Sequence, residues 1–371
     1  MNAIETSIYQ DLMDALLILN PNTTPVSPSD INSYDGEVPC QYILHGPPGC
    51  GKTYTLQTSY ISQFEKDNRF ITTFHQAFSY EEFVEGLKPI LVDDTTQNAT
   101  GDVKYKVVKG IFREACDRAA KLAGYASLKD CIDDSFANRQ VKMAQAIRDK
   151  KTVLLGIDEI NRGNVVSIFG DLISLIESTK RLGVEEQSEM TVLLPYSHEE
   201  FGVPANLIII GTMNTADRSI QLLDSALRRR FKFIDLSPKY DGFCSTEAST
   251  ILKGINSRVR CLLNKDNQIG HSYLMSAKDS CEILAALYYK IIPLLEEYFY
   301  DDAQKVRFVL NDKDGVFYQK DEDAAKSYKA FMEIAVENEE RDFYILNPDI
   351  AKALKQKDEN LCKKYLENLL K

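Results

Sequence analysis

Short apolar runs alternate with segments of helical spacing from residue 38 to residue 237. The apolar runs are rich in Ile, Leu and Val, which is typical of buried strands in a parallel sheet. Between them, apolar residues recur every three or four positions, which indicates helices packed on that sheet. The pattern therefore predicts an α/β fold with a parallel sheet. Its strands are expected at 41–45, 69–74, 152–158, 206–212 and 231–234.

A long insertion separates the second and third expected strands. Ser79-Tyr-Glu-Glu-Phe has the composition of a helix start. A β-hairpin is expected around residues 94–109, and a helix from Ile111 to Leu122.

The two ends of the chain have different patterns. Residues 4–19 have the apolar spacing of a short amphipathic helix, and the Pro-, Ser- and Asn-rich stretch after them is a linker. Beyond residue 237 the strand signals fade and residues 247–310 have helical spacing, with a kink expected at Pro293. These patterns divide the chain into four segments: an N-terminal helix and linker (1–37), an α/β core (38–237), a helical segment (238–311) and a charged, mostly helical tail (312–371).

The composition disfavours a membrane-spanning protein, a secreted protein and a protein whose whole surface binds nucleic acid. The 371 residues are 44% hydrophobic but contain no apolar run long enough for a membrane span, and the N-terminus lacks the features of a signal peptide. The eight cysteines are scattered without a C-x-x-C pair, which predicts reduced thiols in a cytoplasmic protein. The net charge of −11 disfavours a surface devoted to nucleic acid, so DNA binding would need a local basic strip.

Residues 46–53 carry the clearest chemical signal. Gly-Pro-Pro-Gly-Cys-Gly-Lys-Thr matches the P-loop pattern G-x-x-x-x-G-K-[ST] at every constrained position. The glycines allow backbone N–H groups to surround phosphate oxygens, Lys52 is expected to reach the terminal phosphates, and Thr53 to bind Mg²⁺. A Gly-rich turn without chemistry is the alternative. The expected strand before this loop and helix after it favour nucleoside triphosphate binding.

Two further strands end in polar residues. Asp158 and Glu159 follow the third strand, where Asp158 would hold the magnesium ion and Glu159 would orient the attacking water. Asn214 follows the fourth strand and is a candidate to hold that water or the γ-phosphate. Helix capping is the plainer interpretation of both sites. The P-loop upstream favours the catalytic interpretation of Asp158 and Glu159.

Arg228, Arg229 and Arg230 precede the last expected strand. Such a run usually forms a solvated basic face. In a ring-shaped NTPase the same position projects an arginine toward the nucleotide of the next subunit, where it stabilises transition-state charge.

Together these motifs make the chain resemble the McrB-type branch of the AAA+ NTPases, the motor subunits of modification-dependent restriction systems. The matching segments lie at 46–54, 74–89, 157–162, 211–219, 223–231, 269–273 and 293–301.

The resemblance implies a five-stranded AAA+ core with a C-terminal helical lid, assembly into a ring that is typically hexameric, and a preference for GTP over ATP. It also implies a partner, an McrC-like nuclease that stimulates hydrolysis, and a role in defence against foreign DNA. Arg229 or Arg230 matches the arginine finger, and Asn214 matches the strand-four motif. The implied nucleotide-binding residues are Gly46, Pro47, Pro48, Gly49, Cys50, Gly51, Lys52, Thr53, Tyr54, Asp217 and Arg218.

Two departures from the family leave questions open. The guanine-reading tetrapeptide Asn-Lys-x-Asp is absent, so GTP rests on the resemblance alone. Only about 40 residues precede the P-loop, too few for the separate DNA-binding domain that family members usually carry. DNA contact is then expected through a partner or through Lys104-Tyr-Lys-Val-Val-Lys109 as a pore loop, although that stretch also suits an ordinary hairpin strand.

Two other functions compete with a restriction motor. The acidic charge and the missing DNA-reading domain suit an ATP-dependent protein-remodelling chaperone of the MoxR type. A nuclease in its own right is disfavoured, because the chain lacks an Asp…Glu-x-Lys constellation apart from the NTPase motifs.

Overall fold

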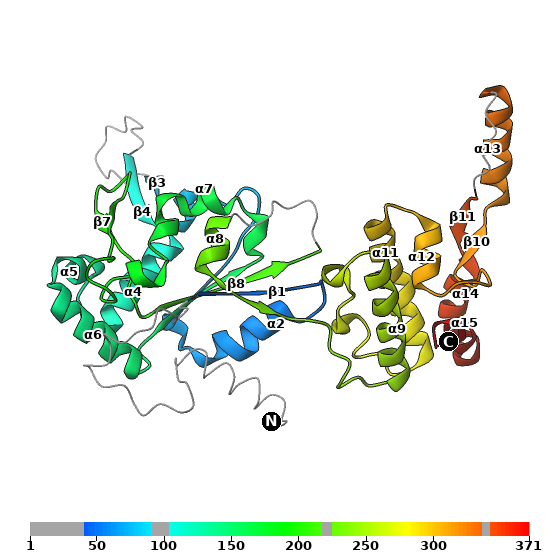
Figure 1. The fold of residues 1–371 in the computed structure, drawn as a ribbon, viewed down its shortest axis with the longest axis horizontal. Helices are drawn as coiled ribbons and strands as arrows, with labels where there is room; N and C mark the ends of the chain where they lie inside the picture. The colour runs from blue at the N-terminus through cyan, green and yellow to red at the C-terminus, as the bar shows by residue number, and fades with distance from the viewer. Residues whose placement is uncertain (1–40, 91–103, 217–224, 336–341, 371) are drawn as a thin grey trace, which may run out of the picture. The chain divides into compact units, whose positions relative to one another are not determined.

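A computed structural model describes residues 41–90, 104–216, 225–335 and 342–370 (Figure 1). These residues form two units. Residues 41–45 and 52–235 belong to a sheet unit, whereas residues 46–51 pack with residues 236–370 in a helical unit. The predicted N-terminal helix and linker lie outside the described residues. Within the described ranges, every helix is too short or too polar to cross a membrane.

The sheet unit is built on a five-stranded parallel sheet with the order β2-β5-β8-β1-β9. The predicted strands are all present, with ends that differ by one or two residues, so the predicted fold class is confirmed. The strands are β1 (Gln41–Gly46), β2 (Arg69–Thr73), β5 (Val153–Asp158), β8 (Leu207–Asn214) and β9 (Lys232–Asp235).

Apolar side chains on both faces of the sheet form the core of this unit. On the adjacent strands β5 and β8, Leu155 and Ile209 on one face and Leu154 and Ile210 on the other are fully buried. Beside them, the Phe83 ring stacks on Phe112 with their centroids 5.0 Å apart. The surrounding helices are α2 (Lys52–Thr55), α4 (Ile111–Leu122), α5 (Leu128–Asp133), α6 (Phe136–Arg148), α7 (Val165–Phe169) and α8 (Ser225–Arg230), and a short strand pair joins β6 (Val192–Leu193) to β7 (Glu200–Phe201).

The insertion after β2 contains the predicted helices and an antiparallel hairpin. Ser79 caps α3 (Tyr80–Phe83) through a reciprocal capping box with Glu82, as its helix-start composition indicates. The hairpin pairs β3 (Glu85–Ile90) with β4 (Lys104–Lys109), so its first strand lies before the range that the sequence predicts. Buried Glu85 accepts hydrogen bonds from the backbone of residues 196 and 197, which anchors the base of the hairpin.

The helical unit begins with α9 (Thr246–Leu262) and continues through α10 (Ser280–Ala286), α11 (Ile292–Phe299) and α12 (Ala303–Val309). Pro293 lies in the first turn of α11, where a missing N–H leaves no helical hydrogen bond unmade. A π-helical segment, Leu287–Ile291, precedes it. The interruption of the helix therefore falls before Pro293 rather than at it.

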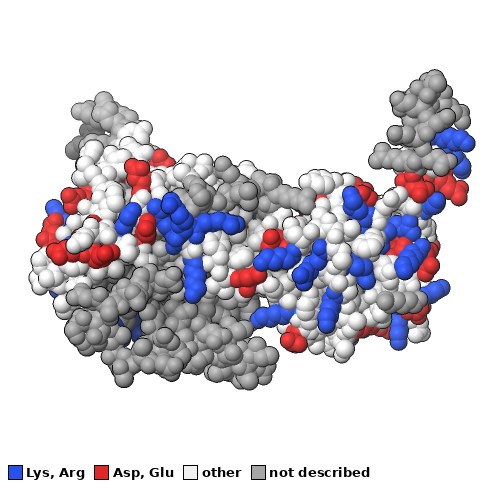
Figure 2. All heavy atoms as spheres, viewed as in Figure 1, with Lys and Arg blue, Asp and Glu red and all other residues white. Residues whose placement is uncertain are grey.

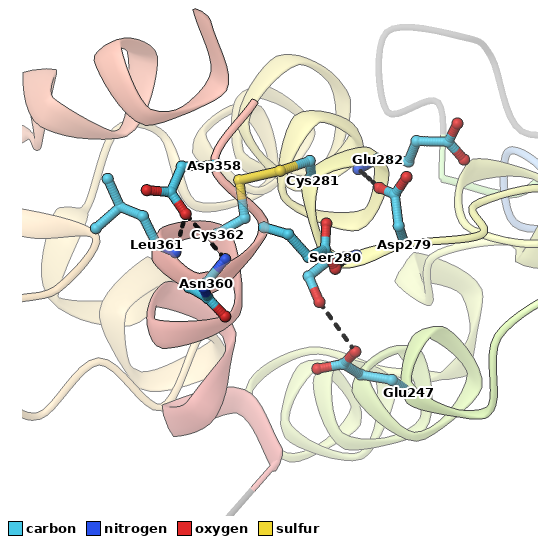
Figure 3. The surroundings of a disulfide bond; sticks show 10 residues. Glu247, Asp279, Ser280, Cys281, Glu282, Asp358, Asn360, Leu361 and Cys362 are labelled. Carbon is cyan, nitrogen blue, oxygen red and sulfur yellow. Dashed lines mark hydrogen bonds between the residues drawn. A yellow bond between two sulfur atoms is a disulfide. The ribbon is translucent and has the colours of Figure 1, made fainter. Parts of the chain in front are cut away.

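The described part of the tail is mostly helical, and it also contains two short strands. It contains a strand pair, β10 (Tyr318–Lys320) with β11 (Tyr344–Leu346), beside the helices α13 (Glu322–Ala335), α14 (Pro348–Gln356) and α15 (Glu359–Leu370). Figure 3 shows a disulfide between Cys281 of α10 and Cys362 of α15. The prediction of reduced thiols is therefore wrong for this pair, because folding brings together two cysteines separated by 81 residues.

Candidate functional site

The P-loop connects β1 to α2, as the sequence predicts. Gly49 and Gly51 both have φ near +78°, in the left-handed region that glycine adopts without strain. The side chain of Lys52 is buried, whereas Thr53 and Tyr54 are exposed on the first turn of α2. Helical structure continues through the π-helical segment Leu56–Tyr60.

In the sheet unit, the Thr53 hydroxyl lies 3.0 Å from Oδ1 of Asp158 and donates a hydrogen bond to it. The hydroxyl of Thr212, on the neighbouring strand β8, donates to the same oxygen. A hydroxyl and a carboxylate are hard oxygen ligands of the kind that Mg²⁺ prefers. Thr53 and Asp158, which are 105 residues apart in sequence, are thus close enough to share one ion, and this donor pair fits the predicted magnesium site.

Glu159 has a strained backbone. Its φ of 54° and ψ of 46° place a residue with a Cβ in the left-handed region, at a cost of about 1 kcal/mol or more. The Glu159 N–H donates to Oγ1 of Thr212 at 3.0 Å, which helps to hold this conformation. The turn redirects the carboxylate from the line of strand β5.

The Glu159 carboxylate is fixed from two sides. Asn214 Nδ2 donates to its Oε1 at 2.6 Å, and Arg162 Nε lies 3.5 Å from its Oε2. Asn161, which is 6% exposed, donates through Nδ2 to the backbone oxygen of Asn214 at 3.2 Å. Asn214 therefore contacts the candidate base directly. Its predicted contact with water or with the γ-phosphate stays a prediction.

Sequence reasoning missed Thr212 and Asn161. Thr212 is 1% exposed and lies near the end of strand β8, next to Gly211. A buried hydroxyl needs hydrogen-bond partners, so a polar residue at that position was the available signal. Its partners depend on how β8 pairs with β5, which no local pattern reveals.

The arginine run divides into residues with different surroundings. Arg229 is exposed at the end of α8. The side chain of Arg230 is only 10% exposed, and its Nη2 lies 3.4 Å from Oε2 of Glu177. Arg228 lies over the ring of Phe233, with the guanidinium carbon 5.7 Å from the ring centroid. Arg229 is therefore better placed than Arg230 to reach another subunit.

The remaining candidates contribute little to the described geometry. Asp217 and Arg218 lie outside the described residues. On the hairpin, Tyr105 is 66% exposed beside exposed Lys106. Figure 2 shows Lys and Arg side chains interspersed with Asp and Glu side chains on the face that it presents. DNA contact through the hairpin stays a prediction.

Comparison with known proteins identifies the family. The family model of the AAA domain, dynein-related subfamily, matches residues 41–231, which include the P-loop, Asp158, Glu159 and Asn214. The chain belongs to the AAA family. A second model, the alpha-helical lid domain of McrB, matches residues 247–307. The chain therefore joins the AAA nucleotide-hydrolase fold to an McrB-type lid, as the motifs predict.

Two relatives of this AAA chain come from restriction systems. The type IV methyl-directed restriction enzyme EcoKMcrB subunit of Escherichia coli (strain K12) is 32% identical over 292 residues, covering 71% of this chain and 54% of the relative. The type II restriction enzyme BsuMI component YdiS of Bacillus subtilis (strain 168) is 24% identical over 269 residues, covering 65% of this chain and 74% of the relative. The chain thus spans about half the length of the E. coli relative.

Proposed function

We propose that this chain is a nucleoside triphosphatase that prefers GTP and drives a nuclease partner in defence against foreign DNA. One observation supports the proposal that the chain hydrolyses nucleoside triphosphates. The hydroxyls of Thr53 and Thr212 donate to Asp158, the backbone N–H of Glu159 donates to Thr212, and Asn214 donates to the Glu159 carboxylate. These groups thus form one hydrogen-bonded set at the carboxyl ends of the adjacent strands β5 and β8. Ligand sites in parallel α/β sheets lie at that edge.

Each residue has a role that follows from its chemistry. Lys52 supplies a positive charge for the terminal phosphates. Thr53 and Asp158 would hold Mg²⁺, which when bound neutralises charge on the phosphate oxygens. Glu159 accepts the proton of the attacking water, and Asn214 orients the Glu159 carboxylate through the 2.6 Å hydrogen bond.

The choice of GTP, the ring and the nuclease partner rest on the resemblance to the McrB-type NTPases. The McrB-type lid and the two restriction-system relatives support a homo-oligomeric ring, hexameric by family, that works with an McrC-like nuclease. DNA would reach the assembly through that partner or through the β3–β4 hairpin. The same comparisons favour a restriction motor over a MoxR-type chaperone that uses ATP.

Turnover by the purified chain tests the proposal. We expect GTP to be hydrolysed faster than ATP in the presence of Mg²⁺. Lys52→Ala should lose nucleotide binding. Glu159→Gln should bind nucleotide but turn over about a hundredfold or more slowly, as expected for loss of a general base. Faster hydrolysis of ATP would contradict the GTP preference and favour the chaperone.

Matched controls separate these effects from general damage. Lys66→Ala and Glu186→Gln change exposed residues of the same types elsewhere in the sheet unit and should leave turnover unchanged. The site assignment would be wrong if Lys52→Ala and Glu159→Gln hydrolysed nucleotide at the rate of these controls. Sedimentation with and without nucleotide measures the proposed assembly, and a monomer under both conditions would contradict the ring.

A further inference from the structure

A turn in the helical unit forms backbone hydrogen bonds with the P-loop. We call residues 269–273, between α9 and α10, the lid turn. The N–H of Gly270 donates to the carbonyl oxygen of Pro48 at 3.0 Å, and the N–H of Ser272 donates to that of Gly49, also at 3.0 Å. Two consecutive P-loop carbonyls are therefore held by one short segment of the lid.

The backbones of the P-loop and the lid turn come into close contact at a glycine in each segment, Gly49 and Gly270. A Cβ atom added to Gly270 would lie 2.0 Å from the carbonyl carbon of Gly49 and 2.5 Å from the nitrogen of Cys50. A Cβ atom on Gly49 would lie 2.5 Å from Cε2 of Tyr273, so the tyrosine ring covers the loop at that point. Only glycine permits this approach at position 270, because the obstructing atoms belong to backbone.

The lid turn is itself fixed to the body of the lid. Asn256, fully buried in α9, accepts a hydrogen bond from the N–H of Ile269 at 2.6 Å and donates to its carbonyl oxygen at 2.9 Å. The N–H of Lys239 donates to Nδ1 of His271 at 3.2 Å. Burial, together with the nearby charge of Lys239, lowers the pKa of His271, which keeps the ring neutral and Nδ1 available as an acceptor. The position of α9 therefore determines the position of the turn.

Because peptide groups are planar, the hydrogen bonds from the lid turn also fix the direction of N–H groups on the opposite side of the P-loop. In a trans peptide the C=O of one residue and the N–H of the next are coplanar and point in opposite directions. Holding the carbonyls of Pro48 and Gly49 from the lid side therefore directs the N–H groups of Gly49 and Cys50 away from the lid turn. In a P-loop, such N–H groups bind phosphate oxygens.

We propose that the lid turn is a positioning element of the nucleotide site, which sets the direction of the phosphate-binding N–H groups and so couples the position of the lid to nucleotide affinity. This proposal rests on the proposed NTPase function. Gly270 and Tyr273 are positioning residues, since they act on phosphate through the P-loop. A partner that moves the lid helices would change nucleotide affinity by this route.

Gly270→Ala is the direct test. The methyl group must displace the P-loop backbone, so we expect the Kd for N-methylanthraniloyl-GTP, and for the ATP form, to rise on the order of tenfold to a hundredfold. The kcat at saturating nucleotide should change far less, because the residues around Glu159 are untouched. Gly254→Ala is the matched control in α9, where an added Cβ has ordinary contacts no closer than 3.4 Å. Thermal unfolding without nucleotide should show both variants folded.

Tyr273 provides a second test if Gly270→Ala fails to fold. Tyr273→Ala removes the ring that covers Gly49 and should also raise the Kd, whereas Tyr273→Phe keeps the ring and should restore it. Wild-type affinity in a folded Gly270→Ala or Tyr273→Ala protein would overturn the proposal. Absence of nucleotide binding by the wild-type chain would instead contradict the proposed function itself.

Discussion

Thr212 is a single hydroxyl that joins both acids of the candidate site. Its oxygen accepts the N–H of Glu159 and its proton goes to Oδ1 of Asp158. The first bond supports a strained backbone, and the second orients the carboxylate that we propose as a magnesium ligand. Because the residue is buried, no water can replace either partner. We therefore expect Thr212 to act as a positioning residue in the proposed hydrolysis.

Replacement of Thr212 tests this role. Thr212→Val keeps the shape but loses both hydrogen bonds, and hydrogen bonds to charged groups contribute about 1.5–3 kcal/mol. We expect kcat to fall roughly tenfold to a hundredfold, with little change in KM because Lys52 and the P-loop remain. Thr212→Ser retains the hydroxyl and should keep most of the activity. Steady-state kinetics decide the matter, and a folded Thr212→Val enzyme with wild-type kcat would refute it.

At the level of elements, the disulfide joins the tail to the lid. Cys281 lies on α10 and Cys362 on α15, and the N–H of Ser280 donates to Glu359 Oε1 at 2.9 Å beside it. The bond closes a loop across 81 residues of sequence. Helix α15 therefore belongs to the structure of the helical unit, although the matched lid model ends at residue 307.

Loss of this bond should destabilise the helical unit. The loop-entropy model gives about 4.5 kcal/mol for a loop of this length. We expect Cys281→Ser to lower the unfolding temperature under oxidising conditions, and a reductant to lower that of the wild type to a similar value. Cys244→Ser, at an exposed free cysteine, is the control and should leave the temperature unchanged. Equal unfolding temperatures for wild type and Cys281→Ser without reductant would contradict a stabilising disulfide.

The ends of helices and strands are predicted correctly from the sequence where the signals are local. Helix α4 has the predicted ends, because Gly110 before it and the apolar spacing along it are local signals. The hairpin begins earlier than predicted, since its first strand, Glu-Gly-Leu-Lys-Pro-Ile, contains Gly, Pro and two charges that disfavour strands. That strand is stabilised by pairing with β4 and by the buried Glu85, which are contacts distant in sequence.

At the scale of the whole molecule, the arginine run at residues 228–230 bears on how subunits would assemble into the proposed ring. Arg229 is exposed, whereas Arg230 is mostly buried beside Glu177 in its own subunit. If subunits form a ring, Arg229 completes the site of a neighbour. Arg230 instead contributes to the stability of the sheet unit.

A mixing experiment tests Arg229. Arg229→Ala should reduce turnover by a factor on the order of a thousand, as loss of an arginine finger does, without loss of nucleotide binding. Mixing it with Glu159→Gln should restore part of the turnover, because some interfaces then combine an intact Glu159 with an intact Arg229. Arg230→Ala should lower stability more than Arg229→Ala. Failure of the mixed proteins to exceed the separate variants would argue against a site shared between subunits.

The sequence by itself determined the strands of the sheet, the P-loop and the two acids after β5. These are local features, since strand and loop preferences depend on neighbouring residues and the P-loop glycines act through their own backbone. It also identified the family, because several motifs occur in order along one chain.

Only the tertiary structure decided which distant groups meet. Thr212 reaches Asp158 through the register of β8 with β5, and Gly270 reaches Pro48 across more than 200 residues of sequence. It also paired Cys281 with Cys362 and distinguished Arg229 from Arg230. Hydrogen bonds and close contacts act over a few ångströms in space, so groups far apart in sequence form them only after the chain has folded.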